Sequence, residues 1–172
     1  LDKTVTAAGS RLLKQWIREP LTEIKKINGR LDRVQEFLEE ETERTSVRQI
    51  LKEVSDIHRI LSRLSSERAS PRDVYQIGRS LDVVMEIRNI LQNSGKVLKE
   101  TLGNAKDTSS VVKLIYSTLV EDPPAGTNKG RYVVTGYSEE LDELRELADN
   151  AAEWLVKYQE NERKSTGINS LK

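Results

Sequence analysis

The chain has 172 residues, of which 36% are hydrophobic and 33% charged, and its 28 basic and 28 acidic side chains give no net charge. The neutral balance disfavours a free-standing nucleic-acid-binding module, which is usually basic, and the low apolar share favours an extended helical protein over a compact globule. The absence of cysteine excludes disulfides, thiolate metal sites and cysteine nucleophiles, and it fits a protein of the cytoplasm. No apolar stretch is long enough to approach a membrane span, so we expect no membrane partner.

Helical periodicity dominates the first third of the chain. Thr6 is a candidate N-cap for a short helix that ends before Pro20, because proline pushes the preceding residue out of the α region. Apolar residues at three- and four-residue spacing predict a second helix over about 22–38 and a third over 46–64. The charged residues 39–44 between them are expected to form a helix end or a loop.

The middle third continues the helical pattern. Ser70 followed by Pro71 is a strong start signal, because serine caps a helix and proline is tolerated at its first position. The fourth helix is predicted to run to about residue 91. Two weaker helical segments are predicted within residues 93–119, and Gly103 lies in the stretch that separates them.

A loop rich in proline and glycine follows at residues 121–137. Its first ten residues, EDPPAGTNKG, contain two prolines and two glycines and cannot continue a helix. The run from Arg131 to Thr135, RYVVT, is β-like but short, so we expect at most a short β segment there.

The last helix is the most informative element. Ser138 is its candidate N-cap, and no glycine or proline occurs until Gly167, so the helix is predicted from about 139 to 164 with a length of roughly 40 Å. Its apolar residues repeat every three or four positions, which defines one face: Leu141, Leu144, Ala148, Ala151, Leu155 and Tyr158. If this face is buried, Leu144 and Leu155 are core positions.

Together these patterns predict an all-α fold. We expect an elongated helical bundle over residues 1–120, the loop over 121–137, and a long helix in the segment 138–172. The chain starts without methionine and stops soon after the long helix, which suggests a piece of a larger protein.

Motifs for chemistry are weak. GTNKG at 126–130 lacks the spacing of a phosphate-binding loop, and His58 is the sole histidine, with no metal-ligand spacing around it. Six carboxylates over 139–149 suit the electropositive first turn of a helix and a solvated face. We therefore predict no catalytic residue, cofactor site or metal site. Basic residues near the other end of this helix suit a helix C-terminus and would also suit an arm that approaches phosphates: Lys157, Arg163, Lys164 and Lys172.

Several blocks, in the correct order, resemble the middle of the MutS family of DNA mismatch-repair ATPases. The opening LDKTVTAAGSRLLKQWIREPL resembles the start of that family's core domain, through Thr6, Gly9, Arg11, Trp16 and Pro20 among others. The blocks INGRLDRVQEFL, LKEVSDIHRILSRL and ASPRD continue the match, and GYSEELDELR and ERKSTGINSLK complete it.

This resemblance implies a fragment of the core, or lever, domain that stops where the family's clamp begins. The fragment would mechanically couple the ATPase domain to the clamp that embraces DNA, and would have no enzymatic activity of its own. Phe37 in FLE would be a packing residue rather than the family's mismatch-reading phenylalanine. The residues Arg163, Lys164 and Lys172 would lie near DNA, and the joints of the lever would lie at Pro123, Pro124, Gly136 and Gly167.

The resemblance also implies the partners of a longer parent protein. The parent would bind ATP and magnesium in a domain absent from this chain, form a dimer, and bind mismatched double-stranded DNA at the bacterial nucleoid. The isolated chain would hold no cofactor and bind little DNA.

Two other classes of function compete with this reading. One is a stand-alone helical adaptor that binds partner helices through an exposed apolar groove, and the other is an enzyme that uses the carboxylates of residues 139–149. A phosphate-binding loop downstream in the same reading frame would favour the MutS reading, whereas a natural stop after Lys172 would favour the adaptor.

Overall fold

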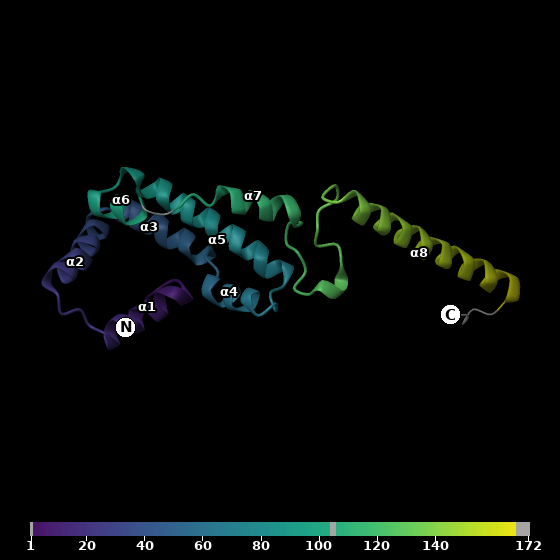
Figure 1. Ribbon diagram of the computed structural model, residues 1–172, viewed down its shortest axis with the longest axis horizontal. Coiled ribbons are helices and arrows are strands. Elements are labelled where there is room, and N and C mark those ends of the chain that lie inside the picture. The colour runs from purple at the N-terminus through teal and green to yellow at the C-terminus, as the bar shows by residue number, and fades with distance from the viewer. Residues whose placement is uncertain (1, 104–105, 168–172) are drawn as a thin grey trace. The chain divides into compact units, whose positions relative to one another are not determined.

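The computed structural model describes residues 2–103 and 106–167, and it confirms the all-α prediction (Figure 1). The described residues form eight α-helices, three short 3-10 turns and no strand. The helices are α1 (Ala7–Arg18), α2 (Ile24–Glu39), α3 (Glu41–Ile50), α4 (Ile57–Ser65), α5 (Pro71–Ile90), α6 (Lys96–Gly103), α7 (Ser109–Thr118) and α8 (Glu139–Thr166), and the turns are Leu51–Glu53, Leu91–Asn93 and Thr127–Lys129. The chain divides into two compact units, Leu1–Tyr132 and Val133–Lys172.

The two N-caps predicted in the first half of the chain, Thr6 and Ser70, are confirmed. The Thr6 hydroxyl accepts a hydrogen bond from the Gly9 amide at 3.0 Å and caps α1. At α5, the Ser70 hydroxyl accepts from the Asp73 amide at 3.2 Å, and the Asp73 carboxylate accepts from the Ser70 amide at 3.0 Å. This reciprocal capping box satisfies two amide groups that the helix itself leaves unpaired.

The prediction of one helix over 46–64 is wrong, because α3 and α4 are separate. The chain is extended at Val54 and resumes as α4 after Asp56, whose carboxylate caps the new helix by accepting from the Arg59 amide at 3.3 Å. A side chain of α5 stabilises the break, because the Ser55 amide donates a hydrogen bond to the Ser80 hydroxyl at 3.0 Å. Side chains on a neighbouring helix thus replace the helical hydrogen bonds that the break removes. Of the two alternatives predicted for the charged residues 39–44, the helix end is the one observed, because α2 ends at Glu39 and α3 begins at Glu41.

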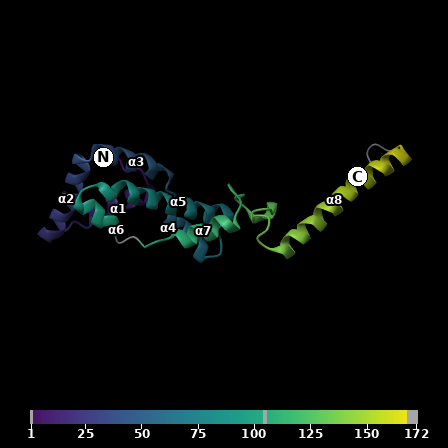
Figure 2. The same cartoon turned by 90° about the horizontal axis from the view of Figure 1, so that it is seen from above.

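The first unit is built around α5, which contacts α3, α4, α6 and α7. Figures 1 and 2 show α7 running alongside α5. The main core cluster joins three helices and the turn after α5, and consists of Val47, Val83, Ile87, Leu91 and Leu98. Phe37 of α2 packs against this cluster, which confirms its predicted packing role.

Gly78 lets α7 approach α5 closely. A Cβ atom at this position would lie 3.1 Å from the Tyr116 ring and 3.3 Å from the Ile115 side chain. Both distances are tighter than ordinary van der Waals contact, so a larger residue would push α7 away from α5.

A carboxylate from α2 anchors the start of α6. The Glu36 oxygens accept from the Val97 amide at 2.9 Å and from the Leu98 amide at 2.6 Å. Both amides belong to the first turn of α6, where the helix itself supplies no acceptor and a negative charge is favourable. Glu36 thereby fixes the position of Leu98, whose residue exposure is only 2%.

The first helix is held to α4 by an ion pair. The Arg11 guanidinium donates two hydrogen bonds to the Asp56 carboxylate, at 2.6 and 2.7 Å. These bonds from Arg11 are the main reason that the pKa of Asp56 is lowered to about 2. No residue of α1, which lies entirely within the described part of the chain, is buried, so polar contacts contribute much of its attachment.

The proline- and glycine-rich loop is closed at its base. The Val120 amide donates to the Tyr132 carbonyl at 3.0 Å. From Arg131 to Thr135 the chain forms no strand, and Val133 alone is part of an isolated β bridge. Within the described residues, no helix has the length and apolar character needed to cross a membrane.

Candidate functional site

The long helix α8 is the candidate functional element of the second unit. It has 28 residues without interruption, which corresponds to a length of about 42 Å. The Ser138 hydroxyl accepts from the Leu141 amide at 3.3 Å, as predicted for an N-cap. At the other end Gly167 is left-handed, with φ of 71°, and its amide donates to the Arg163 carbonyl at 3.0 Å. Because only glycine adopts this conformation without strain, Gly167 is a specific stop signal.

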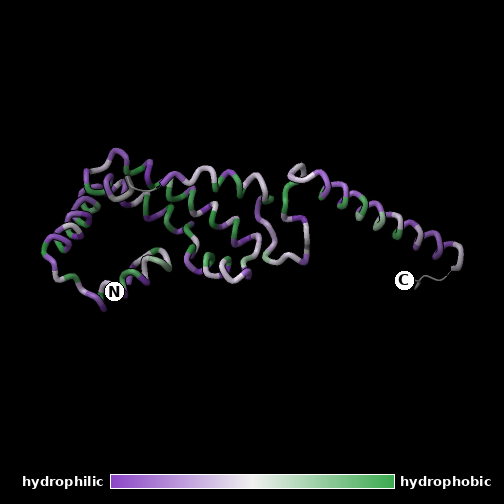
Figure 3. Tube along the Cα trace, viewed as in Figure 1, coloured by the Kyte–Doolittle hydropathy of each residue, from purple (hydrophilic) through white to green (hydrophobic). Residues whose placement is uncertain are grey.

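The apolar face of α8 is exposed. None of its 28 residues, all of which the structure describes, is buried. Leu144 and Leu155 are 57% and 59% exposed, so neither is a core position in this chain. Figure 3 shows hydrophobic residues along one side of α8 and hydrophilic residues along the other. Trp154 and Tyr158 stack on each other on this helix, with ring centroids 5.3 Å apart.

The carboxylates of 139–149 do not gather into a site. Asp142 instead fastens the segment that precedes α8: it accepts from the Gly136 amide at 2.6 Å and pairs with Arg145 at 3.1 Å. The Arg145 guanidinium also donates to the Val133 carbonyl at 3.0 Å. No group of three potential metal ligands occurs among the described residues.

The residues proposed as joints differ in their surroundings. Pro123 is almost fully buried, and its carbonyl accepts from the Arg72 guanidinium at 2.9 Å, so it is anchored to α5, while Pro124 is half-buried. Gly136 has φ of 86° and precedes α8, and Gly167 ends it.

Two of the three basic residues predicted to lie near DNA are at the C-terminal end of α8. Arg163 and Lys164 are in its last turn, where cations interact favourably with the helix dipole. Lys157, one of the other basic residues, pairs with Glu153 at 3.7 Å on an exposed surface. Lys172 lies outside the described residues.

Two other motifs singled out in the sequence take no part in a site. His58 is exposed at the start of α4. The segment 126–130 contains the 3-10 turn Thr127–Lys129 and adopts no phosphate-cradling turn before a helix.

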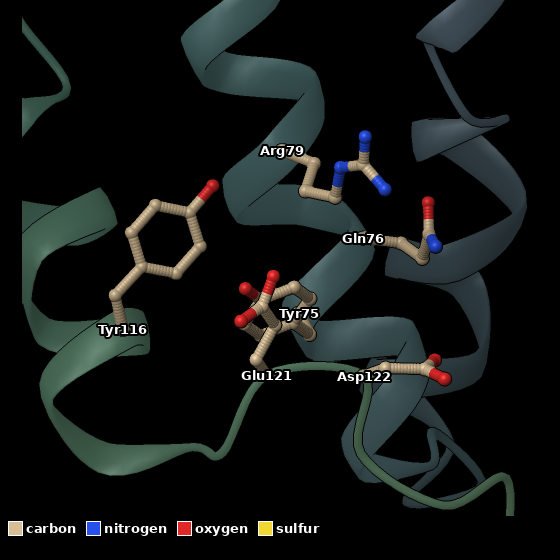
Figure 4. Close-up of a pocket in the computed structure, with 6 residues that line it drawn as sticks. All are labelled: Tyr75, Gln76, Arg79, Tyr116, Glu121 and Asp122. Atoms are coloured by element: carbon tan, nitrogen blue, oxygen red, sulfur yellow. The ribbon is translucent and has the colours of Figure 1, made fainter.

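A polar pocket between α5, α7 and the segment after α7 was not foreseen from the sequence (Figure 4). It has a volume of about 370 Å³ and is lined by Tyr75, Gln76, Arg79, Tyr116, Glu121 and Asp122. The two tyrosine rings lie 5.2 Å apart. The Tyr116 hydroxyl donates to the Asp82 carboxylate at 2.5 Å, and burial together with this bond raises the Tyr116 pKa far above its usual value.

Tyr116 therefore stays protonated at neutral pH, and the pocket offers no activated base from this side chain. No sequence signal could have identified the pocket, because its lining comes from segments more than 30 residues apart that carry no motif.

Comparison with known proteins identifies the family. The family model described as MutS domain III matches residues 1–164. The chain is similar to proteins named DNA mismatch repair protein MutS: 38% identical to that of Methanosarcina mazei over 177 residues and 39% identical to that of Shouchella clausii over 172 residues. Both alignments cover 100% of this chain and 20% of the relative, so the chain spans about one fifth of the length of these curated relatives.

The match to the family model and the observed all-α fold both agree with the resemblance seen in the sequence blocks. The matched region includes the capped starts of α1, α5 and α8 and nearly all of the long helix. The chain belongs to the MutS family and corresponds to its domain III.

Proposed function

We propose that this chain is the lever segment of a MutS-type DNA mismatch-repair protein, in which it mechanically couples an ATPase domain to a DNA clamp. The observation that carries the proposal is α8, a single helix of 28 residues with a cap at each end. An uninterrupted helix transmits displacement along its axis, because each residue is fixed to the next turn by a backbone hydrogen bond. In this proposal it is the longer protein that binds mismatched double-stranded DNA, binds ATP with magnesium, and forms a dimer.

Two further features support a mechanical role. The residues of α8 are not used to build a core in this chain, so the helix is available to contact other parts of a longer protein. The first unit, in contrast, has its own packed core around α5.

We propose that the C-terminal end of α8 is the part of this chain that lies near DNA in the longer protein. Arg163, Lys164 and Lys172 would contribute a basic end beside the clamp. Because the 172 residues carry no net charge, the isolated chain should bind DNA weakly. Because their sequence contains no phosphate-binding loop motif, it should have no ATPase activity. The stand-alone adaptor is not favoured, since nearly the whole chain matches one domain of a larger family.

The test is Ala148→Pro in a longer MutS protein that carries this segment. Proline in a helix interior removes a hydrogen bond, clashes with the preceding turn and costs about 3 kcal/mol or more. Basal ATP hydrolysis should survive, while ATP-driven release from mismatched DNA should fail.

Glu139→Pro is the matched control, because residue 139 is the first of α8 and proline is tolerated there. Both variants must first show near-normal helix content by circular dichroism. A folded Ala148→Pro variant that releases DNA on ATP addition as fast as the Glu139→Pro variant would refute the lever role of this helix.

A further inference from the structure

The exposed face of α8 has the pattern of a coiled-coil seam. Its residues alternate at three- and four-residue spacing over about two and a half heptads: Leu141, Leu144, Ala148, Ala151, Leu155 and Tyr158. We call this set the α8 seam. Two large apolar residues flank the α8 seam on one side, Leu147 and Trp154, which are 66% and 61% exposed. We propose that, in this 172-residue chain, the α8 seam of a second copy covers it as an antiparallel helix pair.

The spacing of large and small residues gives the register. With the twofold axis midway between Ala148 and Ala151, these two small residues face each other across the pair. Leu144 then faces Leu155 of the second copy, and Leu141 faces Tyr158 of the second copy. Every layer of the α8 seam is filled from both sides, and the small residues let the two helices approach most closely at the centre.

The flanking residues favour the antiparallel direction. In this register Leu147 lies beside Trp154 of the second copy, because like flanking positions meet across an antiparallel pair, and two exposed apolar side chains become covered together. In a parallel pair each would instead meet the opposite flank, where Ala152 and the polar Gln159 lie.

The distribution of charge points the same way. Residues 139–149 carry six acidic and one basic side chain, whereas residues 150–166 carry three of each. A parallel pair would place one strongly acidic half against the other, and like charges in proximity are destabilising. An antiparallel pair places each acidic half beside the half that contains Lys157, Arg163 and Lys164.

The absence of cysteine in the chain makes a direct test possible. Chains with Leu144→Cys are mixed with chains with Leu155→Cys under mild oxidation, and the cross-linked species are distinguished by mass. The mixed disulfide should form, because the two positions face each other, while neither variant alone should cross-link. Two copies of residue 144 would be 11 residues apart along the antiparallel pair, about 16 Å, well beyond the reach of a disulfide.

Glu146→Cys mixed with Glu153→Cys is the matched control. These positions have the same symmetric spacing about the twofold axis but lie on the opposite, polar side of α8. The seam pair should cross-link at least about tenfold faster than the control pair, because pairing raises the effective thiol concentration only at the seam. Circular dichroism should show equal helix content in all four variants, since their replaced side chains are exposed.

Sedimentation of the unaltered chain provides the independent readout. Its mass should rise from 19.6 kDa toward twice that value with increasing concentration, and Leu144→Glu should keep it at 19.6 kDa. A monomer at every concentration, or a mixed seam disulfide no faster than the control, would overturn the proposal. Rapid cross-linking within the Leu144→Cys variant alone would also overturn it, because it would show a parallel pair.

Discussion

The contact between Glu36 and α6 allows a sharp test of how the first unit is held together. Glu36→Gln keeps the length and shape of the side chain but removes its charge and replaces one oxygen with an NH₂ group. The glutamine carbonyl can still accept from one of the amides of Val97 and Leu98. The NH₂ group would then face the other amide, which leaves two donors opposed and one backbone amide unpaired.

The magnitude follows from the two bonds, at 2.9 and 2.6 Å. Hydrogen bonds to charged groups contribute about 1.5–3 kcal/mol each, and a carboxylate at a helix N-terminus adds about 0.3–1 kcal/mol. Glu36 is half-buried, so solvent weakens both effects, and one bond survives in the variant. We expect Glu36→Gln to lower the free energy of unfolding by about 1–3 kcal/mol.

Urea unfolding monitored by Trp16 fluorescence measures this change. Trp16 lies on α1 and contacts Arg30 of α2, 3.7 Å from the ring centroid, so its signal reports on the first unit. A Trp154→Phe background removes the other tryptophan, which lies on α8. The denaturation midpoint should fall without a change in the slope m.

Glu39→Gln is the control for this experiment, because Glu39 is an exposed carboxylate on the same helix and its hydrogen bond is to Gln35, within α2. It should shift the free energy by less than about 0.5 kcal/mol. If Glu36→Gln and Glu39→Gln have equal midpoints, the bonds from Glu36 to α6 do not stabilise the fold.

The remaining predictions concern burial and pH. Leu98→Ala should destabilise the first unit by about 2–5 kcal/mol in urea unfolding, because Leu98 is 2% exposed, whereas Leu144→Ala, at 57% exposure, should change the same transition by less than about 0.5 kcal/mol; equal effects would contradict the assignment of the core. The lowered pKa of Asp56 means that its contribution is complete above about pH 4 and is lost as the pH falls toward about 2. Arg11→Gln should therefore flatten the decrease in stability between pH 4 and 2 in acid titrations, and an unchanged slope would refute the role of this ion pair.

Local signals in the sequence were enough to locate most helices. Thr6, Ser70 and Ser138 all form the predicted caps, because a cap depends on residues within a single turn. The uninterrupted length of α8 was likewise predictable from the absence of glycine and proline between its caps.

The break between α3 and α4 was missed because the apolar spacing continues through it. Ile50, Val54 and Ile57 fit one helical face, yet the break is stabilised by Ser80, 25 residues away along the chain. The one local clue was Asp56, an N-cap residue type in the middle of the predicted helix. Single-helix periodicity contains no information on such long-range hydrogen bonds.

Periodicity also does not reveal what covers an apolar face. The pattern of α8 was correct, but Leu144 and Leu155 are exposed in this chain. The anchoring of α6 by Glu36 and the polar pocket were equally beyond the sequence, because both join segments that only the fold brings together.

The hydrogen bond between Val120 and Tyr132 closes the proline- and glycine-rich loop at its base, so the loop does not act as a spacer between the residues on either side of it. Since the two ends of the loop are tied at 3.0 Å, its contour length does not set the distance between the residues before and after it. Insertions or deletions within 125–130, which lie beyond the buried and anchored Pro123, should therefore leave the bundle and the start of α8 unaltered. The length of this part of the loop is therefore free to vary, whereas the short stretch from Val133 to Tyr137 is constrained, because the Val133 carbonyl and the Gly136 amide are both hydrogen-bonded to side chains of α8.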